Sequence, residues 1–231
     1  MKINFKKNET FVTIALIIIY VLLNTICLNN FGQHDIRTFI CNLVLVLLLL
    51  VFIYKNKLFN YLGLNSFPKA KKYLYFIPLL LIVSVNLWNI TSINYSVKEI
   101  ISFIGTMLLI GFLEEIIFRG FLFKVLAKEN VEKAIVIASL TFGVGHAVNL
   151  LNGASLYPTM MQMIYSIAIG YLFANIFYET KSIWPCIITH ALMNALSVFN
   201  TIESKTHLLI VTIFLTAISL VYAEYIKNKN N

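Results

Sequence analysis

The chain has few charged residues and few cysteines. Charged side chains make up 12% of the 231 residues and apolar side chains 59%, whereas soluble domains average roughly 25% charged and roughly 45–50% apolar residues. This composition excludes an ordinary water-soluble domain. The three cysteines, Cys27, Cys41 and Cys186, show no CxxC or other metal-ligand spacing. We therefore expect an integral membrane protein with unpaired thiols and no cysteine-bound metal.

The apolar residues gather in eight runs, each of which is predicted to cross a bilayer as a helix of about 20 residues. The runs are too long for strands and lack strict alternation. We expect one integral-membrane domain, 1–231, that is all-α: a polytopic helical bundle of about eight transmembrane helices in the cell membrane. The predicted spans are 11–28, 39–54, 74–92, 100–123, 134–151, 157–178, 183–200 and 207–226.

Basic residues are distributed unevenly between the two sides of this predicted bundle. With eight spans both termini lie on one side, and fourteen lysines fall there, against Arg37, Lys98 and Lys205 on the other side. The positive-inside rule therefore predicts that both termini are cytoplasmic. The net charge of +8 is explained by this orientation and by attraction to anionic lipids, so it predicts no nucleic-acid partner. The first run lacks a small-x-small cleavage site, and we expect a retained helix.

Two adjacent glutamates, Glu114 and Glu115, interrupt the fourth apolar run, and Arg119 follows them. A carboxylate at the centre of a membrane helix costs at least ~2.5–3.5 kcal/mol. A structural salt bridge with Arg119 would explain one glutamate but not the second. The pair therefore indicates a functional site, such as a proton pathway, a counter-charge for a ligand, or a catalytic centre.

Two of the four histidines, His146 and His190, also lie inside predicted spans. Asn194 follows His190 by four residues and so projects from the same helix face. A helix rises about 1.5 Å per residue, which gives each polar group a depth from the nearest cytoplasmic lysine. The depths are about 15 Å for Glu114, 14 Å for His190, and 20 Å for His146 and Asn194. Four polar groups from three helices thus converge within roughly one helical turn.

Each glutamate has a different expected role. Glu115 and Arg119 are four residues apart with the acid first, which is the favoured order for a helical ion pair. Glu114 projects about 100° away on the same helix. It therefore remains available as a general base toward a water molecule.

The histidines and the asparagine have several possible roles. His146 and His190 could position that water, bind a metal or stabilise an oxyanion, and Asn194 could donate a hydrogen bond to the same oxyanion. Two histidines, a glutamate and an open position would suit a zinc hydrolase. The HExxH spacing is absent, so the sequence leaves zinc open, with His146 and His190 as the candidate ligands.

These residues form three motifs that resemble those of the CPBP intramembrane proteases. That family includes the type II CAAX prenyl endopeptidases and the bacterial Abi proteins linked to bacteriocin processing and self-immunity. The resemblance covers residues 98–200, the expected protease core. The motifs are Glu114-Glu115-x-x-x-Arg119, Phe142-x-x-x-His146 and His190-x-x-x-Asn194.

The resemblance implies a glutamate-dependent intramembrane endopeptidase that cleaves a membrane-associated peptide or protein. Glu114 would activate water, His146 and His190 would complete the site, and Asn194 would bind the oxyanion. Glu115, Arg119 and Phe142 would support these four residues.

Two other functions remain open at this stage. The first is a non-catalytic bacteriocin immunity or scaffold protein, in which the loss of Glu114 would have no phenotype. The second is a proton-coupled transporter with the glutamates and histidines as a relay. Against the transporter, the sequence has no inverted repeat and no duplicated pattern of broken helices.

The predicted orientation can be tested with reporter fusions at Asn231 and in the loop near Asn94. The bias of basic residues predicts that a fusion at Asn231 reports the cytoplasm and one near Asn94 the opposite side. A C-terminus found outside would contradict the orientation and the depths derived from it.

Overall fold

The computed structural model of the chain describes residues 5–67, 76–88, 90, 94–200 and 204–230. Nearly all of these residues are helical, and Ile90 and Asn200 form an isolated β-bridge. The α-helices are α1 (Glu9–Phe31), α2 (Ile36–Lys55), α3 (Ile77–Ser84), α4 (Val97–Glu115), α5 (Lys124–Leu126), α6 (Val131–Gly145), α7 (Leu156–Thr180), α8 (Trp184–Leu196) and α9 (Lys205–Asn230). The other turns are 3-10 helices η1 (Phe5–Lys7), η3 (Val85–Leu87), η5 (His146–Leu150) and η6 (Ser197–Phe199), and a π-helix η4 (Ile116–Phe123).

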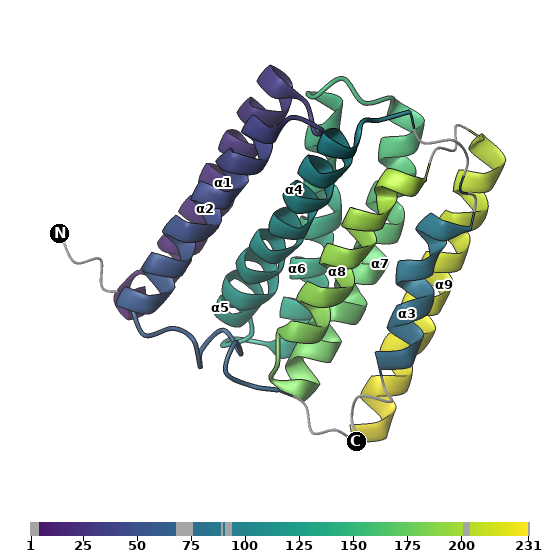
Figure 1. The fold of residues 1–231 in the computed structure, drawn as a ribbon. Helices are drawn as coiled ribbons and strands as arrows, with labels where there is room; N and C mark the ends of the chain where they lie inside the picture. Colours follow the sequence, from purple (N-terminus) through teal and green to yellow (C-terminus); the bar gives the residue numbers. More distant parts are fainter. Residues whose placement is uncertain (1–4, 68–75, 89, 91–93, 201–203, 231) are drawn as a thin grey trace.

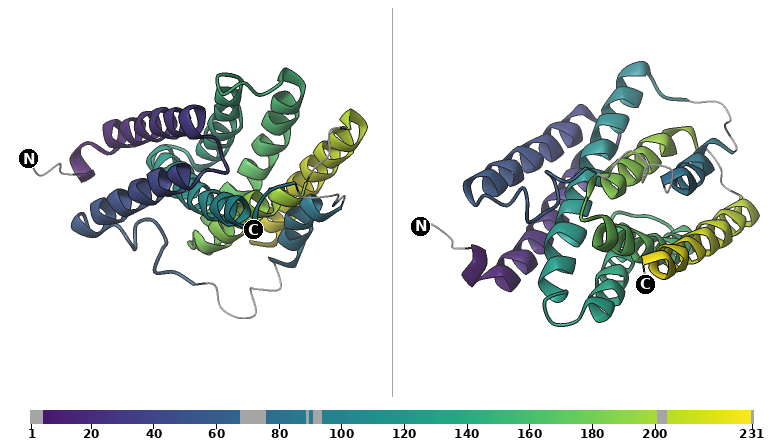
Figure 2. Two further views of the ribbon diagram at one scale, coloured as in Figure 1. Left: turned by 45° about the horizontal axis from the view of Figure 1, so that its top comes forward. Right: turned by 90° about the horizontal axis from the view of Figure 1, so that it is seen from below.

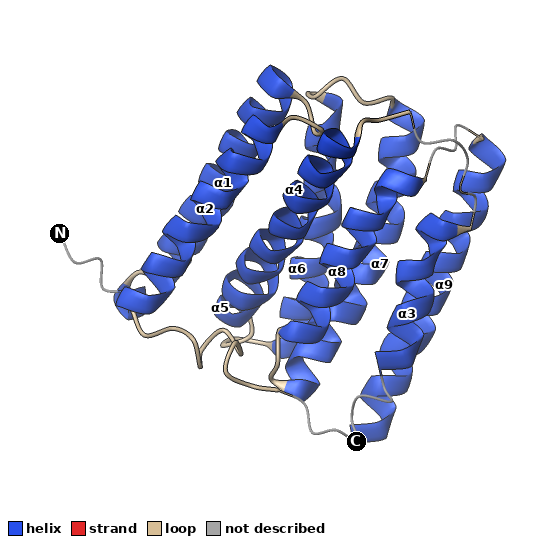
Figure 3. Cartoon of the chain, in the orientation of Figure 1, coloured by secondary structure: helices blue, strands red, loops and turns tan. Residues whose placement is uncertain are grey.

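Each of the eight predicted spans coincides with a helix, and the expected all-α membrane architecture is confirmed (Figure 3). Among the described residues, six helices are long and apolar enough to cross a membrane. The runs predicted at 74–92 and 183–200 give shorter apolar helices, Ile77–Leu87 and Trp184–Phe199. Part of the run 74–92 lies outside the described residues.

The helices run roughly along one common direction (Figure 1). At the centre, α4 packs along α8, and α7 packs against α6 and α9 behind them. The hairpin of α1 and α2 forms one edge, and α3 with α9 forms the other (Figure 2). The start of α1 and the end of α9 lie at the same end of the bundle (Figure 1), as an arrangement with both termini on one side requires.

The outer surface of the bundle is apolar. Phe11, Leu48 and Val221 are among many large apolar side chains that are largely exposed. Water-soluble monomers rarely expose such continuous apolar area. We therefore describe the chain as a multi-pass membrane protein whose outer faces contact lipid.

A small residue sets the distance between α4 and α8. Gly111 of α4 lies against the backbone of Ala191 in α8, and a Cβ atom added at Gly111 would lie 2.7 Å from the Ala191 Cα atom. Small residues at helix interfaces allow such close approach in membranes. This contact brings Glu115, at the end of α4, beside His190 of α8.

Replacement of Gly111 with valine should therefore separate the two helices and prevent stable folding. The expected result is a loss of purified monodisperse protein or a Tm lowered by several degrees, because the new side chain meets backbone and not a flexible side chain. Gly145→Ala is the matched control, since nothing lies within 4 Å of a Cβ at Gly145. Equal melting temperatures for the two variants would contradict the close contact.

Candidate active site

The glutamate pair lies where the helix changes its geometry. Helix α4 ends at Glu115, and the chain continues without a break as the π-helix Ile116–Phe123. Short π-helical segments inside α-helices are frequent at functional sites. Arg119 lies within this segment, and its side chain turns back toward the last residue of α4.

The predicted ion pair between Glu115 and Arg119 is confirmed. The Arg119 Nη1 atom donates a hydrogen bond to Glu115 Oε1 over 3.0 Å. The two side chains are 0% and 1% exposed. The guanidinium group also lies over the ring of Phe142, with its Cζ atom 4.1 Å from the ring centroid. Gly170 of α7 leaves space beside Arg119 Nη2. A buried charge thus has both a carboxylate and an aromatic face as partners.

His190 lies between the two glutamates. Its Nδ1 atom is 2.7 Å from Glu115 Oε1, and its Nε2 atom is 3.6 Å from Glu114 Oε2. Because the Glu115 carboxylate is an acceptor, Nδ1 is assigned as the donor. In a neutral imidazole the lone pair is then on Nε2, on the side of Glu114. Glu115 therefore fixes both the orientation and the tautomer of His190.

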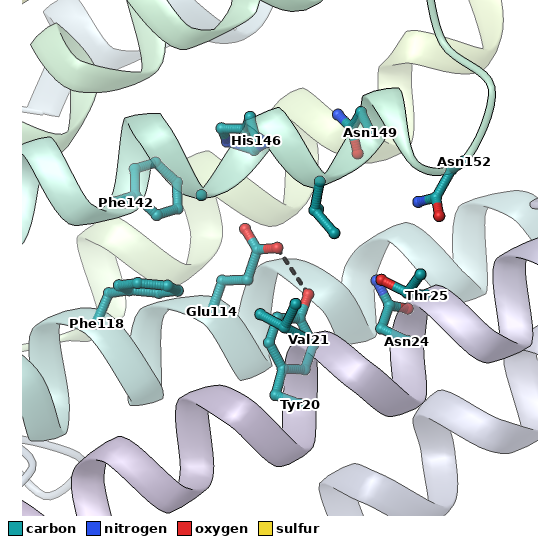
Figure 4. Close-up of a pocket in the computed structure, with 12 residues that line it drawn as sticks. Tyr20, Val21, Asn24, Thr25, Glu114, Phe118, Phe142, His146, Asn149 and Asn152 are labelled. Atoms are coloured by element: carbon teal, nitrogen blue, oxygen red, sulfur yellow. Dashed lines mark hydrogen bonds between the residues drawn. The ribbon is translucent and has the colours of Figure 1, made fainter.

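Glu114 differs from Glu115 in its surroundings. Its Oε1 atom accepts a hydrogen bond of 2.6 Å from the Tyr20 hydroxyl (Figure 4). Its Oε2 atom is buried and has no hydrogen-bond partner among the described residues. The side chain faces a cavity of about 60 Å³. One water molecule needs roughly 10–15 Å³ of such volume, so several fit beside the Glu114 carboxylate.

The cavity has two walls. One is formed by α1 and by Glu114 with Phe118, and the other by the end of α6 and η5 (Figure 4). The lining residues are mostly apolar or neutral polar. Among them, Glu114 carries a carboxylate and His146 an imidazole. They are Tyr20, Val21, Asn24, Thr25, Glu114, Phe118, Phe142, Gly145, His146, Val148, Asn149 and Asn152.

His146 lies at the junction of α6 and η5, on the wall that faces Glu114 (Figure 4). The Phe142 ring, one turn earlier, contacts both histidines edge-on, with centroid distances of 5.2 Å to His146 and 5.6 Å to His190. Phe142 therefore packs between the buried Arg119 and the two imidazoles. The structure brings Glu114, His146 and His190 together, as their calculated depths predicted.

Asn194 is placed differently. It lies one turn beyond His190 on α8 and is half-buried. It is not among the residues that line the cavity, and in the described part of the chain no hydrogen bond of its side-chain amide is found. Its expected role as a donor to the oxyanion stays a prediction.

Sequence reasoning missed the contribution of the first helix. The core was expected within 98–200, yet Tyr20, Asn24 and Thr25 of α1 also line the cavity. The available signal was the pair Tyr20 and Asn24, two polar residues four apart in a predominantly apolar run. Asn24 accepts a hydrogen bond from Asn42 of α2. Long-range contacts such as Tyr20 with Glu114 cannot be read from helical spacing.

A metal site is not formed by the side chains in their present positions. Among the described residues, no group of three or more His, Cys, Asp or Glu side chains is arranged to hold an ion. The Nδ1 atom of His190 contacts Glu115, so only its Nε2 atom remains to bind a metal ion. His146 and His190 as zinc ligands stay a prediction, and we derive no step through a metal.

Comparison with known proteins supports the resemblance carried by the three motifs. Residues 96–196 match the family described as "Type II CAAX prenyl endopeptidase Rce1-like", and the predicted resemblance is confirmed over this segment. The chain is also similar to a Bacillus subtilis (strain 168) protein described as "Putative membrane peptidase YdiL". The two are 35% identical over 92 residues, which cover 39% of this chain and 33% of that protein. The match thus spans about a third of the relative. No solved structure matches the chain.

The buried pair predicts that Glu115→Gln destabilises the protein. The substitution leaves the charge of Arg119 without its carboxylate, and breaking a buried pair from one side costs roughly 3–5 kcal/mol. The Tm of the purified protein should fall by at least several degrees. Glu129→Gln is the control, because Glu129 is exposed in the loop before α6. A Glu115→Gln protein with the same Tm as the wild type would show that the ion pair contributes little to stability.

Proposed function

We propose that the chain is an intramembrane endopeptidase that hydrolyses a peptide bond of a membrane-associated peptide or protein, with Glu114 activating the water molecule. The observation that carries the proposal is the unequal environment of the two glutamates. Glu115 binds Arg119 and His190 through its Oε1 atom. Its Oε2 atom is also buried without a partner among the described residues, but Glu115 does not line the cavity. Glu114 lines the cavity, which has room for water, and its buried Oε2 atom has no hydrogen-bond partner among the described residues.

The proposed reaction begins with a water molecule held in the cavity. Glu114 Oε2 accepts a proton from this water, and the water oxygen forms a bond to the carbonyl carbon of the substrate. The negative charge moves to the carbonyl oxygen. The proposed donors to this oxyanion are His146, which lines the cavity, and Asn194, which the third motif predicts.

The second half of the reaction returns the proton. The carbon–nitrogen bond breaks, and the proton held by Glu114 moves to the leaving amine. One water molecule is consumed, and Glu114 ends as the carboxylate that began the cycle. His190 helps through its position, since its Nε2 atom lies 3.6 Å from Glu114 Oε2 while Glu115 holds its other nitrogen.

The environment of the site favours a membrane-borne substrate. The cavity lies inside a bundle whose outer faces are apolar, so a peptide that is already in or at the bilayer reaches the site without crossing water. The matched family is described as "Type II CAAX prenyl endopeptidase Rce1-like", and the similar protein as "Putative membrane peptidase YdiL". Both descriptions support proteolysis as the reaction class.

The alternatives make different demands on Glu114. A bacteriocin immunity or scaffold protein needs the fold but no base, so Glu114 would be dispensable. A proton relay would need a series of ionisable groups. Beyond Glu114 and His146, however, the cavity wall carries the neutral polar side chains of Asn24, Thr25, Asn149 and Asn152. These neutral polar groups suit a path for water better than a chain of proton carriers.

The proposed mechanism predicts that Glu114→Gln abolishes proteolysis without loss of the fold. Glutamine keeps the size of the side chain and still accepts the Tyr20 hydrogen bond, but it cannot take a proton. Cleavage should fall ~100-fold or more, the usual contribution of a positioned general base. The assay uses the wild type and the variant in lipid vesicles with a panel of single-span membrane peptides. Tm and gel filtration monitor folding.

Two outcomes would contradict this assignment. A Glu114→Gln protein that cleaves like the wild type would exclude Glu114 as the base. A Glu115→Gln protein that is inactive yet melts normally would show that the other carboxylate performs the chemistry.

A further inference from the structure

We propose that Tyr20, on the first helix, is a positioning residue that gives the two oxygens of Glu114 different roles. The proposal rests on the proposed function for its kinetic consequence. Its structural basis is the contact between Tyr20 and Glu114, which does not depend on that function. Helix α1 also lies outside the segment 96–196 that matches the protease family.

The contact itself is short, and its donor is buried. The Tyr20 hydroxyl donates to Glu114 Oε1 over 2.6 Å, and Tyr20 is 6% exposed. This is the length of a charge-assisted bond from a hydroxyl to a carboxylate. The two residues are 94 positions apart in the chain, so the bond exists only because α1 packs against η4. Figure 4 shows the hydroxyl reaching the carboxylate from the wall formed by α1.

The bond distinguishes one oxygen of Glu114 from the other. Oε1 has a donor, whereas Oε2 has no hydrogen-bond partner among the described residues and lies 3.6 Å from His190 Nε2. A carboxylate oxygen that already accepts a strong hydrogen bond is the poorer proton acceptor. Oε2 is therefore the oxygen that takes the proton of water, and Tyr20 prevents the carboxylate from exchanging its oxygens by rotation.

Helix α1 is anchored on both sides of Tyr20, so the hydroxyl has a fixed position. One turn later, Asn24 accepts a hydrogen bond of 3.3 Å from Asn42 of α2, and Asn42 also donates to the Thr38 carbonyl. At the start of α1, Glu9 forms an ion pair with Lys128, beyond the end of α5. A catalytic group gains precision when its supporting partner is itself held in place.

The first experiment is kinetic and uses Tyr20→Phe, which removes only the hydroxyl. With the most rapidly cleaved peptide of the panel, kcat should fall about 10-fold, as loss of one hydrogen bond to a charged group implies, and KM should change less than about twofold. Tyr165→Phe is the matched control, since Tyr165 is a partly buried tyrosine of α7 that does not line the cavity. An unchanged kcat, or a rise in KM alone, would overturn the proposal.

The second experiment does not depend on activity. Melting temperatures are measured for the wild type, Tyr20→Phe, Glu114→Ala and the double variant. Tyr20→Phe should lower the Tm by a few degrees in the wild type and clearly less when Glu114 is alanine, because the hydroxyl then has no carboxylate to hold. Additive shifts would overturn the proposal. A wild type that cleaves no peptide would refute the proposed function, and the melting cycle would still decide whether Tyr20 holds Glu114.

Discussion

The arrangement of the bundle depends on one buried ion pair. Glu115 and Arg119 are removed from both water and lipid, and such charges are tolerated only when each has a partner. His190 is the third member, and it ties the pair on α4 and η4 to α8. The close contact of Gly111 with Ala191 makes this third contact possible. The ion pair and His190 thus hold α4 and η4 next to α8.

The sequence predicted what depends on local spacing. The i, i+4 relation of Glu115 and Arg119 was sufficient to predict their bond, and a constant rise per residue was sufficient to place His146 and His190 near Glu114. The apolar runs predicted where the helices lie. The π-helix after Glu115, the short helices α3 and α8, and the Tyr20 contact were not predicted. These depend on packing between distant segments, which hydropathy and spacing do not encode.

The site combines two parts of the chain with different relations to known proteins. The segment 96–196 carries all three motifs and matches a protease family. The first helix lies outside that match yet supplies Tyr20, Asn24 and Thr25 to the cavity. The ionisable chemistry thus comes from the matched segment, and much of the neutral polar wall comes from α1. A search limited to the matched segment would find Glu114, the proposed base, without Tyr20, its proposed positioning residue.

Because of the π-helix from 116 to 123, the geometry of the site depends on the number of residues in this segment. A π-helical turn accommodates a residue more than an α-helical turn over the same interval. A further residue inserted there, if the π-helix did not absorb it, would rotate the side chains on either side of it by about 100° relative to each other. Glu114 and Arg119 could then no longer both face their present partners. The segment should therefore tolerate a conservative substitution at Leu122, its one residue that is not fully buried, more readily than an inserted residue.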